Sequence, residues 1–235
     1  MSQGSSIAQR LEEIGLTLPD SVRLIAVTKQ VGSEELREAY QAGVRDFAEN
    51  LVQEAEAKQA KLQDIPDITW HLIGHLQSNK AKKALELFTW IHSCDSLALA
   101  QRLDRLAGEM NKSPQICLQI KLLPDPNKYG WEEPDLWQDL PTLAECSNLQ
   151  IQGLMTILPL GLTQEKIAHT FARLKELAAK INHQGILSIQ HLSMGMSQDY
   201  PLAVAAGATM IRLGTTIFGN SLPRGQVQGF PTNLA

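Results

Sequence analysis

The sequence predicts a single (β/α)8 barrel, an α/β fold in which eight parallel strands close on themselves and each is followed by a helix. Strand-like apolar segments alternate with helix-like amphipathic segments along the 235 residues, and no Pro/Gly/Ser-rich linker divides the chain. Strict alternation produces a parallel sheet, and right-handed crossovers cover it with helices. Eight such units in about 220 residues fit a closed barrel. An open doubly wound sheet would carry a glycine fingerprint after its first strand, where this chain has only Gly32.

The elements follow one another in a regular order. An amphipathic segment at residues 9–18 comes first, and we expect it to be an extra N-terminal helix that covers one mouth of the barrel. The expected strands are residues 22–28, 46–48, 69–73, 90–93, 115–121, 149–156, 188–193 and 209–213. The expected helices are residues 33–42, 51–63, 77–88, 96–110, 133–146, 163–183 and 198–206. Residues 1–235 are thus expected to form one domain, with a barrel core at about 20–219 and a polar tail at 220–235.

Composition restricts the class of protein. An apolar fraction of 43% is enough for a sizeable core, and 20% charged residues is ordinary for a soluble protein. The net charge is −4 and there is no basic tract, which argues against a nucleic-acid surface. No run approaches the ~18 apolar residues that span a bilayer, and the first residues lack the apolar core of a signal peptide. We therefore expect a cytoplasmic protein without membrane contact.

Cysteine and histidine spacing argues against a metal site. Cys94, Cys117 and Cys146 are odd in number and widely separated, which fits buried core packing better than disulfides or structural zinc. His71 and His75 are four residues apart, but they flank a strand-like segment and no glutamate lies between them. We expect no metal.

Lys29 ends the most apolar strand of the chain. Six of the eight residues 22–29 (VRLIAVTK) are apolar or β-branched, as in a strand buried on both faces. Lys29 is therefore expected at the carboxyl end of a barrel strand, where barrels place their ligands. A partly desolvated amine there has a lowered pKa and can form a Schiff base. A solvated strand-end charge or an ion-pair partner is the alternative interpretation of this lysine.

The ends of the last two strands predict a phosphate site. SMGMS (193–197) and LGTT (213–216) each place a small residue beside a hydroxyl group. Barrels frequently bind phosphate with the loops after strands seven and eight. Ser197 also fits the N-cap of the following helix, and the two roles are compatible because both use exposed N–H groups.

Arg212 lies within the last strand among apolar neighbours, and a buried guanidinium needs a partner. Two partners are open: an internal ion pair with Asp46 or Glu49, or a ligand's ring nitrogen or carboxylate. Asn50 likewise has a structural alternative, as the cap of the helix that follows it. A lysine amine, a phosphate cradle and an arginine together fit pyridoxal phosphate.

Several longer motifs then point to one family. With these motifs the chain resembles, from about Arg10 to Gly219, the YggS/PROSC group of pyridoxal phosphate homeostasis proteins: AVTK (26–29), AENLVQE (48–54), WHLIGHLQSNK (70–80), GLMTI (153–157), LSMGMSQDY (192–200) and AAGATMIRLGTTIFG (205–219). The resemblance implies a barrel like the N-terminal domain of alanine racemase (a fold-type III pyridoxal phosphate protein), with the cofactor as an internal aldimine on Lys29. It also implies the remaining contacts: the phosphate at Ser197, Gly214 and Thr215, the pyridine nitrogen near Arg212, and the ring beside Asn50 and Ser193.

The same resemblance implies a function in intracellular vitamin B6 homeostasis. We expect a non-catalytic, monomeric carrier that buffers or delivers pyridoxal phosphate, with pyridoxal phosphate-dependent apoenzymes or a regulatory protein as partners. Two sites depart from many relatives: Ala48 and Leu51 stand where these read GENYVQE, and Val31 replaces a second lysine, which leaves Lys128 as the nearby second amine.

Two enzymatic alternatives differ from the carrier in what they require. An amino-acid racemase or decarboxylase would use the same aldimine, but racemization needs an acid/base on each face of the substrate. Fold relatives supply one of these groups with a second domain, for which the residues after Gly219 are too few. A Schiff-base aldolase acting on a phosphorylated sugar would need no cofactor and would be colourless.

Overall fold

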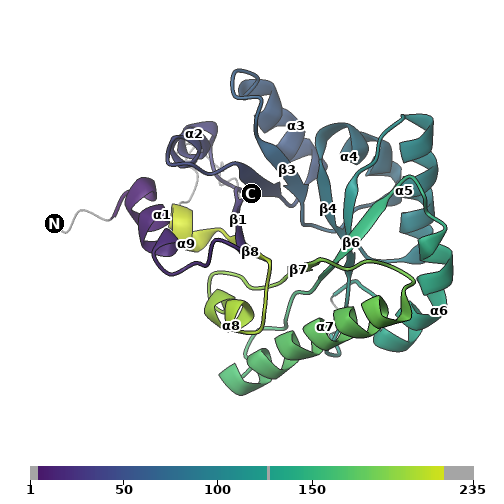
Figure 1. Ribbon diagram of the computed structural model, residues 1–235. Helices are drawn as coiled ribbons and strands as arrows, with labels where there is room; N and C mark the ends of the chain where they lie inside the picture. Colours follow the sequence, from purple (N-terminus) through teal and green to yellow (C-terminus); the bar gives the residue numbers. More distant parts are fainter. Residues whose placement is uncertain (1–4, 126–127, 220–235) are drawn as a thin grey trace, which may run out of the picture.

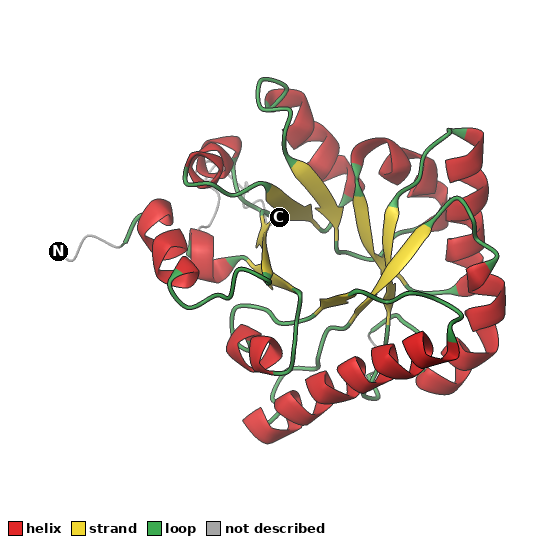
Figure 2. Ribbon diagram, viewed as in Figure 1, coloured by secondary structure: helices red, strands yellow, loops and turns green. Residues whose placement is uncertain are grey.

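Eight parallel strands close into a barrel in which each strand pairs with its neighbours in sequence and β8 pairs with β1. The computed structural model describes residues 5–125 and 128–219. Figure 2 shows the strands enclosed by helices, which confirms the (β/α)8 prediction. The strands begin and end within three residues of the expected positions: β1 (Arg23–Val27), β2 (Asp46–Glu49), β3 (Thr69–Leu72), β4 (Trp90–Cys94), β5 (Gln115–Gln119), β6 (Gln150–Met155), β7 (His191–Ser193) and β8 (Met210–Leu213).

Helices form the outer layer. All seven expected helical regions are helical, the third beginning as a 3₁₀ turn, and the helices that connect the strands are α2 (Ser33–Gln41), α3 (Val52–Lys61), η1 (Ser78–Lys80) with α4 (Ala81–Leu87), α5 (Leu97–Glu109), α6 (Glu133–Ala144), α7 (Gln164–Gln184) and α8 (Tyr200–Ala205). A single-turn helix after β8, α9 (Thr215–Phe218), was not expected, because four residues are too few to show helical periodicity.

The first helix, α1 (Ile7–Gly15), does not cover a mouth of the barrel, so that expectation was wrong. It lies in the outer layer, where it packs against α2 and α9 (Figure 1). Its buried face consists of Ile7, Leu11 and Ile14. Helix α9 is a single turn, and α1 packs beside it and extends the outer layer at this place.

The apolar core has two layers, one between the strands and the helices and one inside the barrel. The inner layer is made by Ile25, Val27, Ala48, Trp90, Cys117, Met155 and Met210. Gly153 belongs to this interior because a Cβ there would lie 2.5 Å from Cys117 Sγ. The three cysteines are free and buried, as expected, and burial raises the pKa of Cys117 to about 12.

Two further expectations concern the C-terminal tail and membrane-spanning helices. The tail predicted at residues 220–235 lies outside them. Among the helices of the described ranges, none is long and apolar enough to cross a membrane.

Candidate functional site

The seven expected ligand residues come from four consecutive strands of the closed sheet. Lys29 and Asn50 follow β1 and β2, Ser193 and Ser197 belong to the end of β7 and its loop, and Arg212, Gly214 and Thr215 belong to β8 and its turn. Backbone pairing joins these strands in the order β7, β8, β1 and β2. The carboxyl ends of neighbouring parallel strands lie at one edge, so the structure gathers these residues on one side of the barrel mouth.

Lys29 lies just beyond β1 with an exposed side chain. The expected partial desolvation is not found, because the chain turns as soon as β1 ends. The Val31 N–H donates to the Thr28 carbonyl at 2.9 Å, and Gln30 has a φ of 61°. Within the described residues no carboxylate forms an ion pair with Lys29, so the structural alternative that survives is a solvated strand-end amine. The amine is open to a ligand.

A buried polar cluster anchors the strand end on which Lys29 stands. Lys58 Nζ donates to the Thr28 carbonyl at 2.5 Å and to Glu49 Oε1 at 2.6 Å. The Thr28 hydroxyl donates to the same carboxylate at 2.5 Å. Burial raises the pKa of Glu49, and the hydrogen bonds from Lys58 and Thr28 oppose that shift. The cluster connects the ends of β1 and β2 to α3. Because Glu49 pairs with Lys58, it is not the ion-pair partner of Arg212.

Ser197 connects the loops that follow β7 and β8. The backbone N–H of Thr216 donates to Ser197 Oγ at 3.3 Å. The expected capping role was wrong: Asp199 occupies the N-cap position of α8, and its carboxylate accepts the Met196 N–H at 2.6 Å. The loop also requires Gly195, which has a φ of 94° and would place a Cβ 2.6 Å from Ala203 Cβ. Hydroxyl and backbone donors of two loops are thus held next to each other, beside Gly214 and the exposed Thr215.

Arg212 is 3% exposed and forms neither of the expected ion pairs. Its Nη1 donates to Ser193 Oγ at 2.6 Å, and its Nη2 donates to the Thr156 carbonyl at 2.9 Å. Burial lowers the pKa of Arg212 to about 10, so the guanidinium is still charged at neutral pH. Both partners are neutral oxygens, which leaves a buried positive charge for an anionic or electron-rich ligand group.

Asn50 does not cap α3, because Leu51 holds the N-cap position and no side chain bonds to that end of the helix. Asn50 instead borders a cavity of about 620 Å³ at the mouth, which Gly74, His75 and Lys80 also line. A Cβ on Gly74 would lie 2.1 Å from the Asn50 carbonyl oxygen. The loops after β2 and β3 therefore touch backbone to backbone at the edge of the site.

The comparisons with known proteins identify the family of this chain. Residues 3–222 match the alanine racemase N-terminal domain family. A pyridoxal phosphate homeostasis protein of Synechocystis is 59% identical over 89% of this chain and 96% of its own length. The protein of the same name from Pseudomonas aeruginosa is 40% identical over 92% and 93%. This chain belongs to the pyridoxal phosphate homeostasis protein family.

Solved structures of this family and of its fold relatives match as well. PipY of Synechococcus elongatus with pyridoxal phosphate bound is 56% identical, with a TM-score of 0.88 over 91% of this chain and 100% of PipY. PipY without the cofactor gives a TM-score of 0.89 at 58% identity. An alanine racemase of Clostridium difficile is 15% identical, with a TM-score of 0.75 over 92% of this chain and 60% of the racemase. That likeness shows a shared fold.

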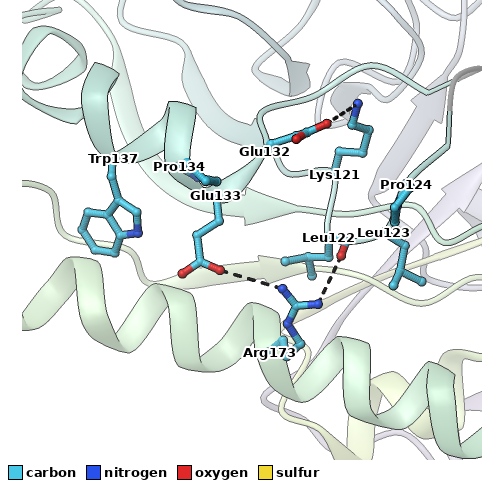
Figure 3. Close-up of a pocket in the computed structure, with 9 residues that line it drawn as sticks. All are labelled: Lys121, Leu122, Leu123, Pro124, Glu132, Glu133, Pro134, Trp137 and Arg173. Carbon is cyan, nitrogen blue, oxygen red and sulfur yellow. Dashed lines mark hydrogen bonds and ion pairs between the residues drawn. The ribbon is translucent and has the colours of Figure 1, made fainter.

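A second cavity of this protein, about 580 Å³, lies on the outside of the barrel between the loop after β5, α6 and α7. Figure 3 shows that its charged side chains pair with one another. Lys121 Nζ lies 3.0 Å from Glu132, and Arg173 lies 3.9 Å from Glu133 and donates to the Leu122 carbonyl at 3.2 Å. None of the expected ligand residues lines it. We therefore interpret this cavity as a gap between packed elements and not as the ligand site.

The site predicted from the sequence did not include two buried histidines that adjoin it. His92 Nδ1 lies 2.8 Å from Ser193 Oγ, and His92 Nε2 lies 2.9 Å from His71 Nδ1. His71 Nε2 lies 2.9 Å from Asp46 Oδ1. In the described ranges no group of three or more potential ligands is arranged to hold a metal ion. The signal in the sequence was the third position of β3 and of β4, where two neighbouring strands both place a histidine.

Proposed function

We propose that this protein binds pyridoxal phosphate at the β7–β8–β1–β2 side of the barrel mouth and serves its homeostasis, by buffering or delivery, without robust catalytic turnover. One observation carries the proposal: an exposed lysine amine, a buried arginine and two bridged hydroxyl-bearing loops lie on four adjacent strands. The names of the relatives and the pyridoxal phosphate bound to PipY support it.

The donor set fits this cofactor. We propose Lys29 Nζ for covalent attachment, Ser197, Gly214 and Thr215 for the phosphate, Arg212 for the ring nitrogen, and Asn50 and Ser193 for the edges of the ring. When bound, the cofactor supplies an aldehyde that condenses with an amine and a ring that withdraws electrons. A permanently charged Arg212 disfavours a protonated ring nitrogen, so the site is suited to holding the cofactor more than to stabilising substrate carbanions.

The test of this proposal is Lys29→Ala. Because the Lys29 side chain is exposed, its truncation should change the free energy of unfolding by less than about 0.5 kcal/mol. The variant should lose the covalent adduct, measured as the absorption of bound cofactor and as the mass of the chain after borohydride reduction. Lys82→Ala, which truncates an exposed lysine on α4, is the matched control and should keep the adduct. If borohydride reduction of Lys29→Ala still added the mass of one cofactor to the chain, another residue would be the attachment site.

The carrier role is separated from enzymatic alternatives by incubating the loaded protein with L-alanine, D-alanine and other amino acids. We expect neither racemization nor decarboxylation over many hours, and steady turnover would replace the carrier proposal with a racemase or decarboxylase. We further propose that the protein acts as a monomer in the cytoplasm. Transfer of cofactor to a pyridoxal phosphate-dependent apoenzyme, followed by the activity that the apoenzyme gains, tests delivery.

A further inference from the structure

A chain of hydrogen bonds crosses the barrel interior from Arg212 to Asp46. It passes from Arg212 Nη1 to Ser193 Oγ (2.6 Å), to His92 (2.8 Å), to His71 (2.9 Å) and to Asp46 (2.9 Å). Asp46 is the first residue of β2, and its carboxylate lies 3.5 Å from Arg23, the first residue of β1. The chain therefore joins the mouth of the barrel to its amino-terminal end.

With both histidine rings neutral, the two ends of the chain fix the direction of every bond in it. A guanidinium can only donate and an ionised carboxylate can only accept. Ser193 accepts from Arg212, so its own proton is available for His92 Nδ1. His92 Nε2–H then donates to His71 Nδ1, and His71 Nε2–H donates to Asp46. When both rings are neutral, each must carry its proton on Nε2.

Burial keeps both rings in that form. His71 and His92 have no solvent exposure, and burial lowers the pKa of each. Trp90 packs against both rings, with centroids 5.9 Å from His71 and 5.6 Å from His92. Because both rings are buried, their ring nitrogens contact only the neighbouring members of the chain, which hold each ring in one tautomer.

We propose that Asp46, His71 and His92 are positioning residues, which set through Ser193 how Arg212 is presented at the mouth and thereby link cofactor affinity to the far end of the barrel. This inference rests on the proposed function. With its proton committed to His92, Ser193 offers a lone pair to Arg212 and fixes the guanidinium. A reversed or broken chain would release the Ser193 proton and free Arg212 to reorient. The Arg23–Asp46 pair is partly exposed, so the chain meets solvent at that end.

The first test needs no cofactor. Imidazole ¹⁵N–¹H correlation spectra of the cofactor-free protein at pH 7 should show His71 and His92 neutral, each with its proton on Nε2. Ser193→Ala should move the Nδ1 resonance of His92 and leave that of His191 in place. A doubly protonated ring, or a proton on Nδ1 of either histidine, would overturn the proposal.

The second test is a double-mutant cycle on the affinity for pyridoxal phosphate. Asp46→Asn lets an amide donor face His71 Nε2, which opposes the direction of the chain. We expect binding about threefold to tenfold weaker, the effect of one hydrogen bond. In a Ser193→Ala background, Asp46→Asn should not weaken binding further, because the hydrogen-bond chain is already broken at Ser193. Independent, multiplicative effects would contradict the proposal, since a purely structural role of Asp46 does not require Ser193.

Two additional variants keep the test decisive. His191→Asn is the matched control: this histidine packs edge-on against Trp90 with centroids 5.2 Å apart but lies outside the chain, and it should change affinity less than twofold. If Asp46→Asn does not fold, His71→Gln replaces it, since its amide can donate to Asp46 but offers His92 no ring nitrogen. A wild-type protein that fails to bind pyridoxal phosphate would refute the proposed function alone, and the tautomer measurement would then decide whether the chain exists as described.

Discussion

Arg212 shows how single residues define this site. A charge buried in a barrel is costly unless it is hydrogen-bonded or paired. In the described part of the protein Arg212 has two neutral oxygen acceptors and no carboxylate in contact. The positive charge is thus solvated by the protein but not neutralised, which is the condition for attracting an electron-rich ligand atom. The exposed Lys29 complements Arg212, because the Lys29 amine is free to react with a ligand whereas hydrogen bonds fix the Arg212 guanidinium.

Ser197 gives a prediction at the same scale. Ser197→Ala removes the acceptor for the Thr216 N–H and a hydroxyl donor from the proposed phosphate cradle. We expect pyridoxal phosphate to bind about tenfold more weakly, the loss expected for one hydrogen bond to a charged group, while the covalent linkage can still form. Titrations followed by absorbance measure this. Pyridoxal, which has no phosphate, is the control ligand and should bind both proteins equally; an equal loss for both ligands would place Ser197 elsewhere.

Residues at strand ends could be located from the sequence, while their contacts could not. Lys29, Asn50, Ser197 and Arg212 were placed correctly because apolar runs and turn residues mark where strands end. The N-cap assignments of Ser197 and Asn50 failed because local motifs compete with partners from distant segments, such as the Thr216 N–H. The Arg212–Ser193–His92 contacts depend on which inward side chains meet across the barrel, which no local pattern encodes.

At the scale of the elements, the site depends on loops held against one another. The loop after β7 meets α9 through the Ser197–Thr216 hydrogen bond, and the loop after β2 meets the loop after β3 at Gly74. Helix α8 was expected from the sequence, whereas α9 was not, because it has a single turn. Gly214 and Thr215 nevertheless form the N-terminal end of α9.

Gly74→Ala tests the contact between the loops after β2 and β3. Its Cβ would lie 2.1 Å from the Asn50 carbonyl oxygen, so backbone must move. We expect a loss of about 1–3 kcal/mol in the free energy of unfolding, and weaker cofactor binding because Asn50 is displaced. Urea unfolding and cofactor titration measure the two effects. Gly15→Ala, which meets nothing within 4 Å, is the control and should leave both unchanged or slightly raise stability.

For the whole molecule, the buried histidines predict sensitivity to acid. Burial lowers the pKa of His71, His92 and His191 below the ordinary value of 6.5, whereas in the unfolded chain each titrates near that value. The unfolded state then binds more protons as the pH falls below about 6.5. The free energy of unfolding should therefore be fully present above that pH and should fall, by up to about 1.4 kcal/mol per pH unit for each histidine, towards the folded pKa values.

Denaturant unfolding between pH 8 and pH 5 checks this prediction. The raised pKa of Glu49 acts in the opposite direction, since its protonation favours the folded state. This effect lies between the ordinary carboxyl value and the raised folded pKa, so it offsets part of the histidine decline in the lower part of this pH range. His92→Asn should flatten the decline relative to the wild type. A free energy of unfolding that stays constant from pH 8 to pH 5 would contradict the neutral, buried state of these rings.

The seam of the barrel has a consequence for how the protein is made. Strands β1 and β8 close the sheet by pairing Ala26 with Leu213, and the proposed attachment lysine and phosphate loops stand on the two sides of that junction. During translation the amine emerges early, and its counterpart emerges last. A growing polypeptide on the ribosome therefore cannot offer the complete set of proposed cofactor contacts until its final strand has docked against the first.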